Sequence, residues 1–193
     1  NTMIYKKHKT AQNLKLAFFA IAAAALVYAC SSTKWGQSPA KDDYKTAKDQ
    51  WKDDKHLEAM VTITQAIIKD PIQPKPKEML YEDCDKMLSE INAELNATKG
   101  TTDIAKAERR HYIYSNLIQL NENFKKIQFP IKHPKGKWSW SAKVVDYTKD
   151  KEEARVYAYQ VIYNHGKNAL KQNQVDNAYK NFTYAFNTYA SSS

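Results

Sequence analysis

The sequence predicts an all-α protein of about six helices, built as helical hairpins with one irregular loop rich in tryptophan and lysine. Apolar residues recur at intervals of three and four from residue 40 to residue 189, which is the spacing that places them on one face of a helix. The chain has only four glycines, fewer than the turns of a strand-rich fold usually take. Prolines and short polar runs separate the periodic stretches, as expected for helices that end and restart.

The first two predicted helices form a hairpin. The first covers residues 40–51, and its inward face is a regular series of Ala40, Tyr44, Ala47 and Trp51. Asp53 and Asp54 make the turn. The second helix covers residues 55–69 and ends before Pro71, because proline cannot continue the hydrogen-bond ladder of a helix.

The third and fourth predicted helices are longer. Three prolines, at positions 71, 74 and 76, are expected to form a stiff connector before a helix over residues 77–97. The fourth helix begins at Thr102 or Asp103 and ends before Pro130. Their inward faces keep the helical spacing, with Leu80, Cys84, Met87, Ile91 and Leu95 in one and Ile113, Leu117, Leu120, Phe124 and Ile127 in the other.

Residues 129–150 break this periodicity and are expected to form an irregular basic and aromatic loop with a short extended piece. Asp150 and Glu153 at its end resemble a capping box, in which two side chains satisfy the free amides of a helix start. A fifth helix over residues 151–171 and a sixth over residues 175–189 follow from the renewed periodicity.

Residues 3–30 have the three parts of an export signal. A basic stretch containing Lys6, Lys7, Lys9 and Lys15 is followed by an uncharged run from Leu16 to Ala29 and then by Cys30. A cysteine directly after a small residue resembles the lipobox of bacterial lipoproteins that signal peptidase II cleaves. The resemblance implies a signal peptide over residues 1–29, a lipid on the Cys30 thiol and a polar tether over residues 30–39.

Two other interpretations of this segment remain open. One is a plain signal anchor, although fourteen apolar residues span only about 21 Å as a helix, short of the roughly 30 Å hydrocarbon core. The other is an ordinary secretory signal in which Cys30 is incidental. The acidic residues that commonly act in sorting are missing after Cys30. We therefore expect a lipid-anchored protein of the outer membrane, facing the periplasm rather than the cell surface.

Small residues recur at matching positions of the first and last hairpins. Gly166, Ala178, Phe182 and Ala185 in the last hairpin correspond to Ala47, Ala59, Ile63 and Ala66 in the first. This pattern resembles the tetratricopeptide repeat, in which small residues let two helices approach closely. The resemblance implies a helical-repeat solenoid with one such hairpin and a long helix pair over residues 40–128 and a second hairpin over residues 151–193, which we expect to continue beyond residue 193. The long helix pair lacks the small-residue pattern. A generic helical bundle is the alternative. The layout also resembles tetratricopeptide lipoproteins of the bacterial envelope.

Several classes of function find no support in the residues. Of the net charge of +9, four positive charges lie in the predicted signal peptide, and the remaining +5 forms no basic stripe, so we expect no nucleic-acid partner. We find no phosphate loop, nucleophile elbow or HExxH sequence, and no two of the five histidines have close metal-ligand spacing. We therefore expect neither catalysis nor a metal, and no cofactor beyond the lipid on Cys30. Cys84, on an apolar helix face, is expected to be buried.

The first candidate binding surface is the loop that carries Trp138 and Trp140 together with Lys135, Lys137 and Lys143. Aromatic rings beside cations are common at interfaces and could hold a sugar polymer, a lipid surface or an acidic partner. In the alternative, the two tryptophans fold back and fill the groove between the fourth and fifth helices.

The second candidate is the aromatic face of the last helix, formed by Tyr179, Phe182, Phe186 and Tyr189. The sequence shows no segment that would cover this face, so it either meets further chain beyond residue 193 or binds a partner. Tyr179 and Phe186 are the candidate binding residues.

Together these features indicate a membrane-anchored, non-catalytic scaffold for protein–protein interaction whose partners are envelope proteins. The alternative is a protein that binds the cell wall or a glycan through Trp138 and Trp140. A third hypothesis, with weaker support, is an accessory of an envelope hydrolase whose catalytic part lies outside this sequence.

Overall fold

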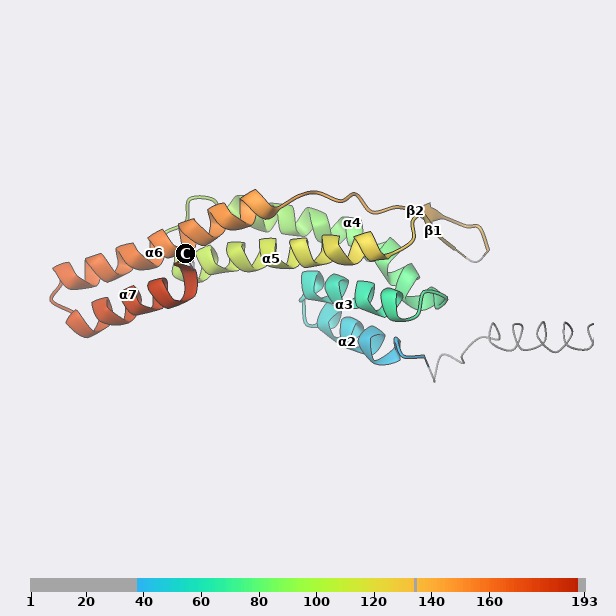
Figure 1. Ribbon diagram of the computed structural model, residues 1–193, viewed down its shortest axis with the longest axis horizontal. Helices are drawn as coiled ribbons and strands as arrows, with labels where there is room; N and C mark the ends of the chain where they lie inside the picture. Colours follow the sequence, from blue (N-terminus) through green and yellow to red (C-terminus); the bar gives the residue numbers. More distant parts are fainter. Residues whose placement is uncertain (1–37, 134, 191–193) are drawn as a thin grey trace, which may run out of the picture. The chain divides into compact units, whose positions relative to one another are not determined.

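The computed structural model describes residues 38–133 and 135–190, and all of its elements belong to the unit Pro39–Ser193 (Figure 1). The predicted signal peptide, Cys30 and most of the tether lie outside the described residues. Six helices make up nearly all of the regular structure there, which confirms the all-α prediction. They are α2 (Lys41–Lys52), α3 (His56–Lys69), α4 (Pro74–Ala97), α5 (Ile104–Lys126), α6 (Thr148–Lys171) and α7 (Val175–Tyr189), with the short strands β1 (Ile131–Lys132) and β2 (Ser139–Trp140) between α5 and α6.

Most helices pack against the next helix of the chain, and α3 packs against two later helices. α2 packs on α3, α3 packs on both α4 and α5, α5 packs on α6, and α6 packs on α7 (Figure 1). The two strands form one antiparallel pair in which Ile131 lies opposite Trp140 and Lys132 lies opposite Ser139. The irregular loop of the sequence analysis therefore contains a small hairpin, followed by an extended run that leads into α6.

Two predicted helix starts were wrong. α4 begins at Pro74, so Pro74 and Pro76 lie in its first turn rather than in a connector. Proline is tolerated there because the first amides of a helix have no partner within the helix. α6 begins at Thr148, and Asp150 therefore lies inside the helix instead of capping it together with Glu153. The N-cap residue of α6 is Tyr147, whose side chain makes no capping hydrogen bond, and the carboxylate of Asp146 before it accepts a hydrogen bond from the Thr148 amide at 2.9 Å.

The apolar side chains gather in two clusters. The larger cluster joins α2, α3, α4, α5 and β1, and includes the fully buried Met60, Ile63, Leu80 and Ile113. The smaller cluster joins α5, α6 and α7, with Ala107, Ala158, Ile162 and Ala185 fully buried. α5 contributes to both. Cys84 is fully buried in the larger cluster, as predicted, and burial raises the pKa of its thiol to about 12, with a further contribution from the Asp85 carboxylate.

The turns of the first and last hairpins have the same backbone structure. In α2–α3 the Lys55 amide donates to the Gln50 carbonyl at 2.9 Å, and in α6–α7 the Gln174 amide donates to the Ala169 carbonyl at 2.9 Å. The residue before each donor has the same left-handed backbone, with φ of 58° at Asp54 and at Asn173. These are the six-to-one hydrogen bond and left-handed residue of a Schellman motif, a common way to end a helix.

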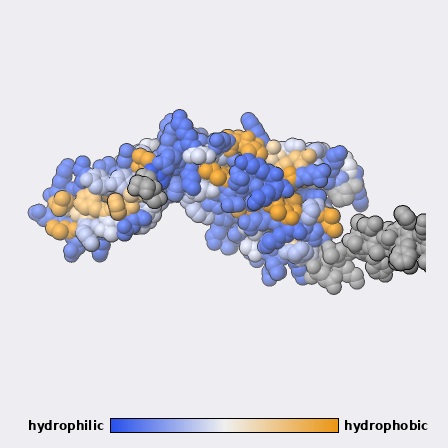
Figure 2. All heavy atoms as spheres, viewed as in Figure 1, coloured by the Kyte–Doolittle hydropathy of each residue, from blue (hydrophilic) through white to orange (hydrophobic). Residues whose placement is uncertain are grey.

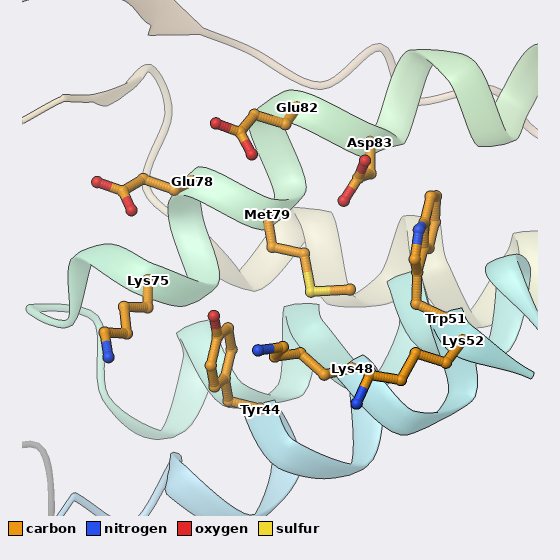
Figure 3. A pocket seen from close by; sticks show the side chains of 9 residues that line it. All are labelled: Tyr44, Lys48, Trp51, Lys52, Lys75, Glu78, Met79, Glu82 and Asp83. Carbon is orange, nitrogen blue, oxygen red and sulfur yellow. The ribbon is translucent and has the colours of Figure 1, made fainter.

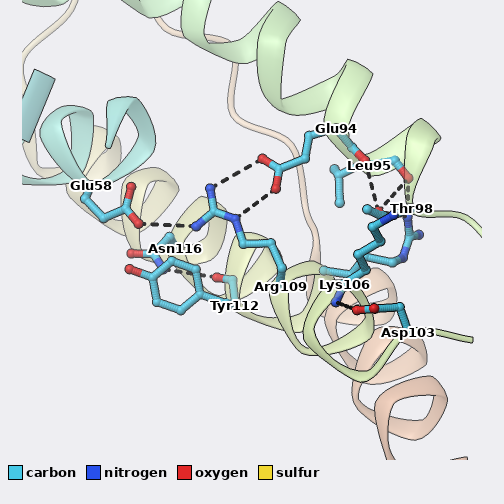
Figure 4. Close-up of polar contacts among 10 residues, drawn as sticks. Glu58, Glu94, Leu95, Thr98, Asp103, Lys106, Arg109, Tyr112 and Asn116 are labelled. Carbon is cyan, nitrogen blue, oxygen red and sulfur yellow. Dashed lines mark hydrogen bonds and ion pairs between the residues drawn. The ribbon is translucent and has the colours of Figure 1, made fainter. Parts of the chain in front are cut away.

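Buried and half-buried polar groups fix α5 against α3 and α4 (Figure 4). The Arg109 guanidinium donates to both carboxylate oxygens of Glu94, at 2.9 and 3.3 Å, and contacts Glu58 at 3.4 Å. Asp103 caps α5 by accepting from the Lys106 amide at 2.9 Å. The bidentate geometry sets the angle at which three helices meet, because a planar guanidinium matches a carboxylate in one orientation only.

Candidate functional site

A groove of about 300 Å³ lies between α2 and α4 (Figure 3). Met79 lies at its centre, between the two helices. Its α2 wall is formed by Tyr44, Lys48, Trp51 and Lys52, and its α4 wall by Lys75, Glu78, Met79, Glu82 and Asp83. The groove therefore combines two aromatic rings, a thioether and charges of both signs over a small surface.

The spacing of residues along each helix produces this lining. Tyr44, Lys48 and Trp51 stand at i, i+4 and i+7 of α2, which places them in one row along the helix. Glu78 and Glu82 stand at i and i+4 of α4 and form the matching row. The groove is thus made by two single helix faces that the intervening α3 holds in position.

Most of the charge is divided across the groove. The carboxylates of Glu78, Glu82 and Asp83 lie on the α4 side, which also carries Lys75, and Lys48 and Lys52 lie on the α2 side (Figure 3). Burial raises the pKa of Tyr44, and the Glu78 and Glu82 carboxylates raise it further. The negative potential of α4 therefore reaches the opposite wall. The Lys48 ammonium group lies 5.8 Å from the centre of the Tyr44 ring, within the range of a cation–π contact.

Asp83 marks the desolvated end of the acidic wall. Burial raises the pKa of its carboxyl group, and the neighbouring Glu82 carboxylate acts in the same direction against Lys86 and His56. Trp51 lies nearby, with its ring stacked on His56 at a centroid distance of 4.1 Å. Stacking and packing against the larger apolar cluster hold this ring in place. A ligand would thus meet a preformed aromatic surface next to a carboxylate with reduced hydration.

The groups in this groove are suited to recognition. Lysines and carboxylates on opposite walls can pair with charges of both signs, and the rings and Met79 can cover apolar side chains. No cluster of three or more histidine, cysteine or carboxylate groups that could hold a metal ion occurs within residues 38–133 and 135–190. None of the helices in this described part is both long and apolar enough to span a bilayer.

The two tryptophans of the basic loop lie against helices. Trp138 stacks on Tyr81 of α4, with ring centroids 4.2 Å apart and planes 7° from parallel. Trp140 lies edge-on to Phe124 of α5 at 6.1 Å and to Phe129 at 5.8 Å. Both side chains are half-buried and pack against the larger apolar cluster. They thus fold back over α4 and α5, not between the fourth and fifth predicted helices, which are α5 and α6.

The three lysines of this loop remain on the surface. Lys135, Lys137 and Lys143 are all exposed, the first two on the turn between β1 and β2 and the third on the run that leads to α6. One face of Trp138 is covered by Tyr81, and the His133 ring lies edge-on to Trp138 with the two ring centroids 5.5 Å apart. The loop therefore presents charge to solvent and uses its aromatic rings mainly for packing.

The aromatic face predicted for the last helix is divided in two. Tyr179 and Phe186 are 71% and 66% exposed, in keeping with an available surface. Tyr189 is only 6% exposed, which agrees with the inward position that its helical spacing predicts beside Ala178 and Ala185, so it does not belong to the uncovered face. Tyr189 lies on the same face of α7 as the buried Ala178 and Ala185. Its hydroxyl donates a hydrogen bond to the Glu108 carboxylate at 3.2 Å. Burial and Glu108 raise the pKa of Tyr189 well above its ordinary value.

The α2–α4 groove did not emerge from the sequence. Helical spacing predicts Tyr44 and Trp51 on the inward face of the first helix, where both do pack against the larger cluster, but it gives no sign that an acidic row on α4 faces them. The available signal was the pair of opposite charge rows, basic on α2 and acidic on α4, which belong to helices separated by α3. Comparisons with protein-family models, curated proteins and solved structures find no match for this chain.

Proposed function

We propose that this protein is a lipid-anchored, non-catalytic helical scaffold of the bacterial cell envelope that binds partner proteins in the α2–α4 groove. The observation that carries the proposal is the lining of that groove, which has a volume of about 300 Å³. Lys48 and Lys52 line one side, a mainly acidic wall lines the other, and the apolar Met79 lies at the centre. An extended protein segment with alternating charged and apolar side chains complements such a surface.

The helical-repeat interpretation is supported by the two hairpin turns. Their matching hydrogen bonds and left-handed residues are 119 positions apart, since Asp54 corresponds to Asn173. The small residues compared in the sequence analysis have the same separation, as between Ala47 and Gly166. Local geometry and residue pattern thus give one alignment of the two hairpins. We infer that they are tetratricopeptide-like units, with α4 and α5 as a longer pair between them.

A charge reversal on α2 tests the groove. The Lys48→Glu/Lys52→Glu variant should lose partners that chemical cross-linking recovers from envelopes with the unaltered protein. The Lys41→Glu/Lys45→Glu variant is the matched control, because these exposed lysines stand on the same helix outside the groove and give the same change in net charge. Equal recovery by both variants, or no specific partner with any of the three proteins, would refute binding in the groove.

The anchor is proposed to be an acyl chain on Cys30, with the protein on the periplasmic face of the outer membrane. The intact mass of the protein extracted from its own membranes should correspond to a chain that starts at Cys30 and carries acyl groups. A Cys30→Ala variant should lose that species. A chain that retains Lys6 to Ala29 without modification would contradict both the anchor and the proposed location.

A second candidate function is binding to a cell-wall polymer through the basic loop. It is favoured by the exposure of Lys135, Lys137 and Lys143 next to the half-exposed Trp138. Replacing the three lysines with glutamate should abolish sedimentation with cell-wall material, and unchanged sedimentation would exclude this role. Changes at exposed lysines test binding more cleanly than tryptophan substitutions, because the rings also pack against the helices.

A further inference from the structure

The α6–α7 hairpin carries most of the large hydrophobic side chains that are exposed in the described chain. Of the ten large hydrophobic side chains that are exposed among residues 38–133 and 135–190, seven lie on these two helices. Figure 2 shows apolar side chains gathered along this hairpin. We call the surface formed by Tyr163, Leu170, Val175, Tyr179 and Phe186 the hairpin face.

The hairpin face forms two parallel rows, one on each helix. On α6, Tyr159, Tyr163 and Leu170 stand at i, i+4 and i+11, and on α7, Val175, Tyr179, Phe182 and Phe186 stand at i, i+4, i+7 and i+11. Each row is about 16 Å long, at a rise of 1.5 Å per residue. This length corresponds to three turns of a further helix.

Ring contacts join the two rows into one surface. The ring centroids of Tyr163 on α6 and Phe182 on α7 are 5.0 Å apart. Tyr159 stacks on Tyr163 with a centroid distance of 5.9 Å. Phe182 lies directly over Gly166, where α6 has no side chain, so the two helices approach closely. Two closely spaced helices with an apolar seam provide a shallow groove of the kind in which an amphipathic helix can lie.

The charges around the hairpin face select among possible occupants. Residues 164–183 include the exposed lysines Lys167, Lys171 and Lys180 but a single carboxylate, that of Asp176. Lys167 and Lys171 follow Tyr163 at i+4 and i+8, beside the α6 row. An acidic partner is attracted by this excess, whereas a second copy of the hairpin would bring like charges together.

A membrane surface fits less well than a helix. The residues at the tip of the hairpin are Gln172, Asn173 and Gln174, all exposed and polar. Insertion into a bilayer would bury these side chains and their backbone groups in a region that offers no hydrogen-bond partners. The apolar rows instead run along the sides of the helices, where another helix can pack.

We propose that the hairpin face binds an acidic amphipathic helix of a partner protein. The aromatic and aliphatic rows receive the apolar side of that helix, and Lys167, Lys171 and Lys180 pair with carboxylates along its flanks. This site is separate from the α2–α4 groove and does not depend on the function proposed for the groove.

The test uses the full chain and a fluorescent synthetic helix, held helical by a hydrocarbon staple, with leucines at i, i+4, i+7 and i+11 and glutamates on both flanks. Saturable binding measured by fluorescence anisotropy should weaken with added salt, because salt screens exposed charges. A second helix with lysines in place of the glutamates should bind at least about tenfold more weakly, a difference of about 1.4 kcal/mol.

Two double variants distinguish binding at the hairpin face from nonspecific binding to other exposed hydrophobic side chains. Tyr179→Ser/Phe186→Ser should weaken binding of the acidic helix at least about tenfold, because buried aromatic anchors dominate such interfaces. Ile72→Ser/Val144→Ser is the matched control, since both residues are exposed hydrophobics outside α6 and α7, and it should bind unchanged. Lys48→Glu/Lys52→Glu should also bind unchanged, which keeps this result distinct from that of the groove.

Three results would overturn the proposal. The first is the absence of binding to the acidic helix, or equal binding of the acidic and basic helices. The second is binding to vesicles of anionic phospholipid that Tyr179→Ser/Phe186→Ser abolishes, which would assign the face to a membrane. The third is self-association in analytical ultracentrifugation that the same variant abolishes, which would assign it to a second copy.

Discussion

Replacing Gly166 with alanine should destabilise the α6–α7 hairpin even though alanine is the better helix former. A methyl group built on Gly166 would lie 2.7 Å and 2.8 Å from two carbons of the Phe182 ring, well inside normal contact. The gain in helix propensity is about 1 kcal/mol. Overpacking of this kind costs about 1–3 kcal/mol. The expected net loss in the free energy of unfolding is therefore up to about 2 kcal/mol.

A double-mutant cycle isolates the clash from the propensity. Urea unfolding followed by circular dichroism should give the free energy of unfolding for the protein, Gly166→Ala, Phe182→Ala and the double variant. Without the Phe182 ring, Gly166→Ala should stabilise the hairpin by about 1 kcal/mol, because only the propensity gain remains. The sign of the effect should thus reverse between the two backgrounds. Equal stabilisation in both would refute the close approach of α6 and α7, and equal destabilisation in both would show that the ring is not the obstacle.

Three further predictions concern the rest of the fold. Asp103→Ala should lower the melting temperature, with a cost of about 1 kcal/mol for the lost helix cap, while Asp103→Asn should cost little. Trp138→Ala and Trp140→Ala should each lower the free energy of unfolding by about 2 kcal/mol, less than the 3–5 kcal/mol of fully buried rings, and an unchanged urea midpoint would show that the rings contribute nothing to packing. In a Cys30→Ala background, Cys84 should resist a thiol reagent at pH 8 until the protein unfolds, since burial raises its pKa to about 12. The thiol of the unfolded chain ionises near its ordinary pKa of 9.0, whereas the buried thiol stays protonated up to about pH 12. The free energy of unfolding should therefore be unaffected by this group below pH 9 and should fall as the pH rises from 9 toward 12.

The helices themselves could be predicted because periodicity is a local property. The last helix has the predicted bounds, Val175–Tyr189. The first differs from prediction by one residue at each end, and the second by one residue at its start. The errors arose where two local signals compete. Pro74 reads equally well as a connector and as the first turn of a helix. Asp150 and Glu153 have the spacing of a capping box, but the backbone after β2 starts α6 at Thr148, so Asp150 lies inside the helix.

The sites were harder to predict because they join residues that are far apart in the chain. The stacking partner of Trp138 is Tyr81, on a helix that the sequence places well before it. The groove requires the facing rows of Tyr44 on α2 and Glu78 on α4, whose relative position is set by α3. Tyr189 was assigned to an open surface because nothing in the sequence shows that Glu108 lies beside it. Helical spacing gives the face on which a residue lies and leaves its opposite neighbour undetermined.

The matching turns at Asp54 and Asn173 also bear on how quickly this chain can fold. Each turn connects two helices through three residues and closes with a hydrogen bond over five positions, so the contacts it brings together are local in sequence. Chains dominated by such contacts fold rapidly, because little loop entropy is lost before the first favourable contacts form. The α2–α3 and α6–α7 hairpins can each close without waiting for the other. Among the helices of residues 38–133 and 135–190, α5 alone has side chains in both apolar clusters, so we expect its docking to be the slower step.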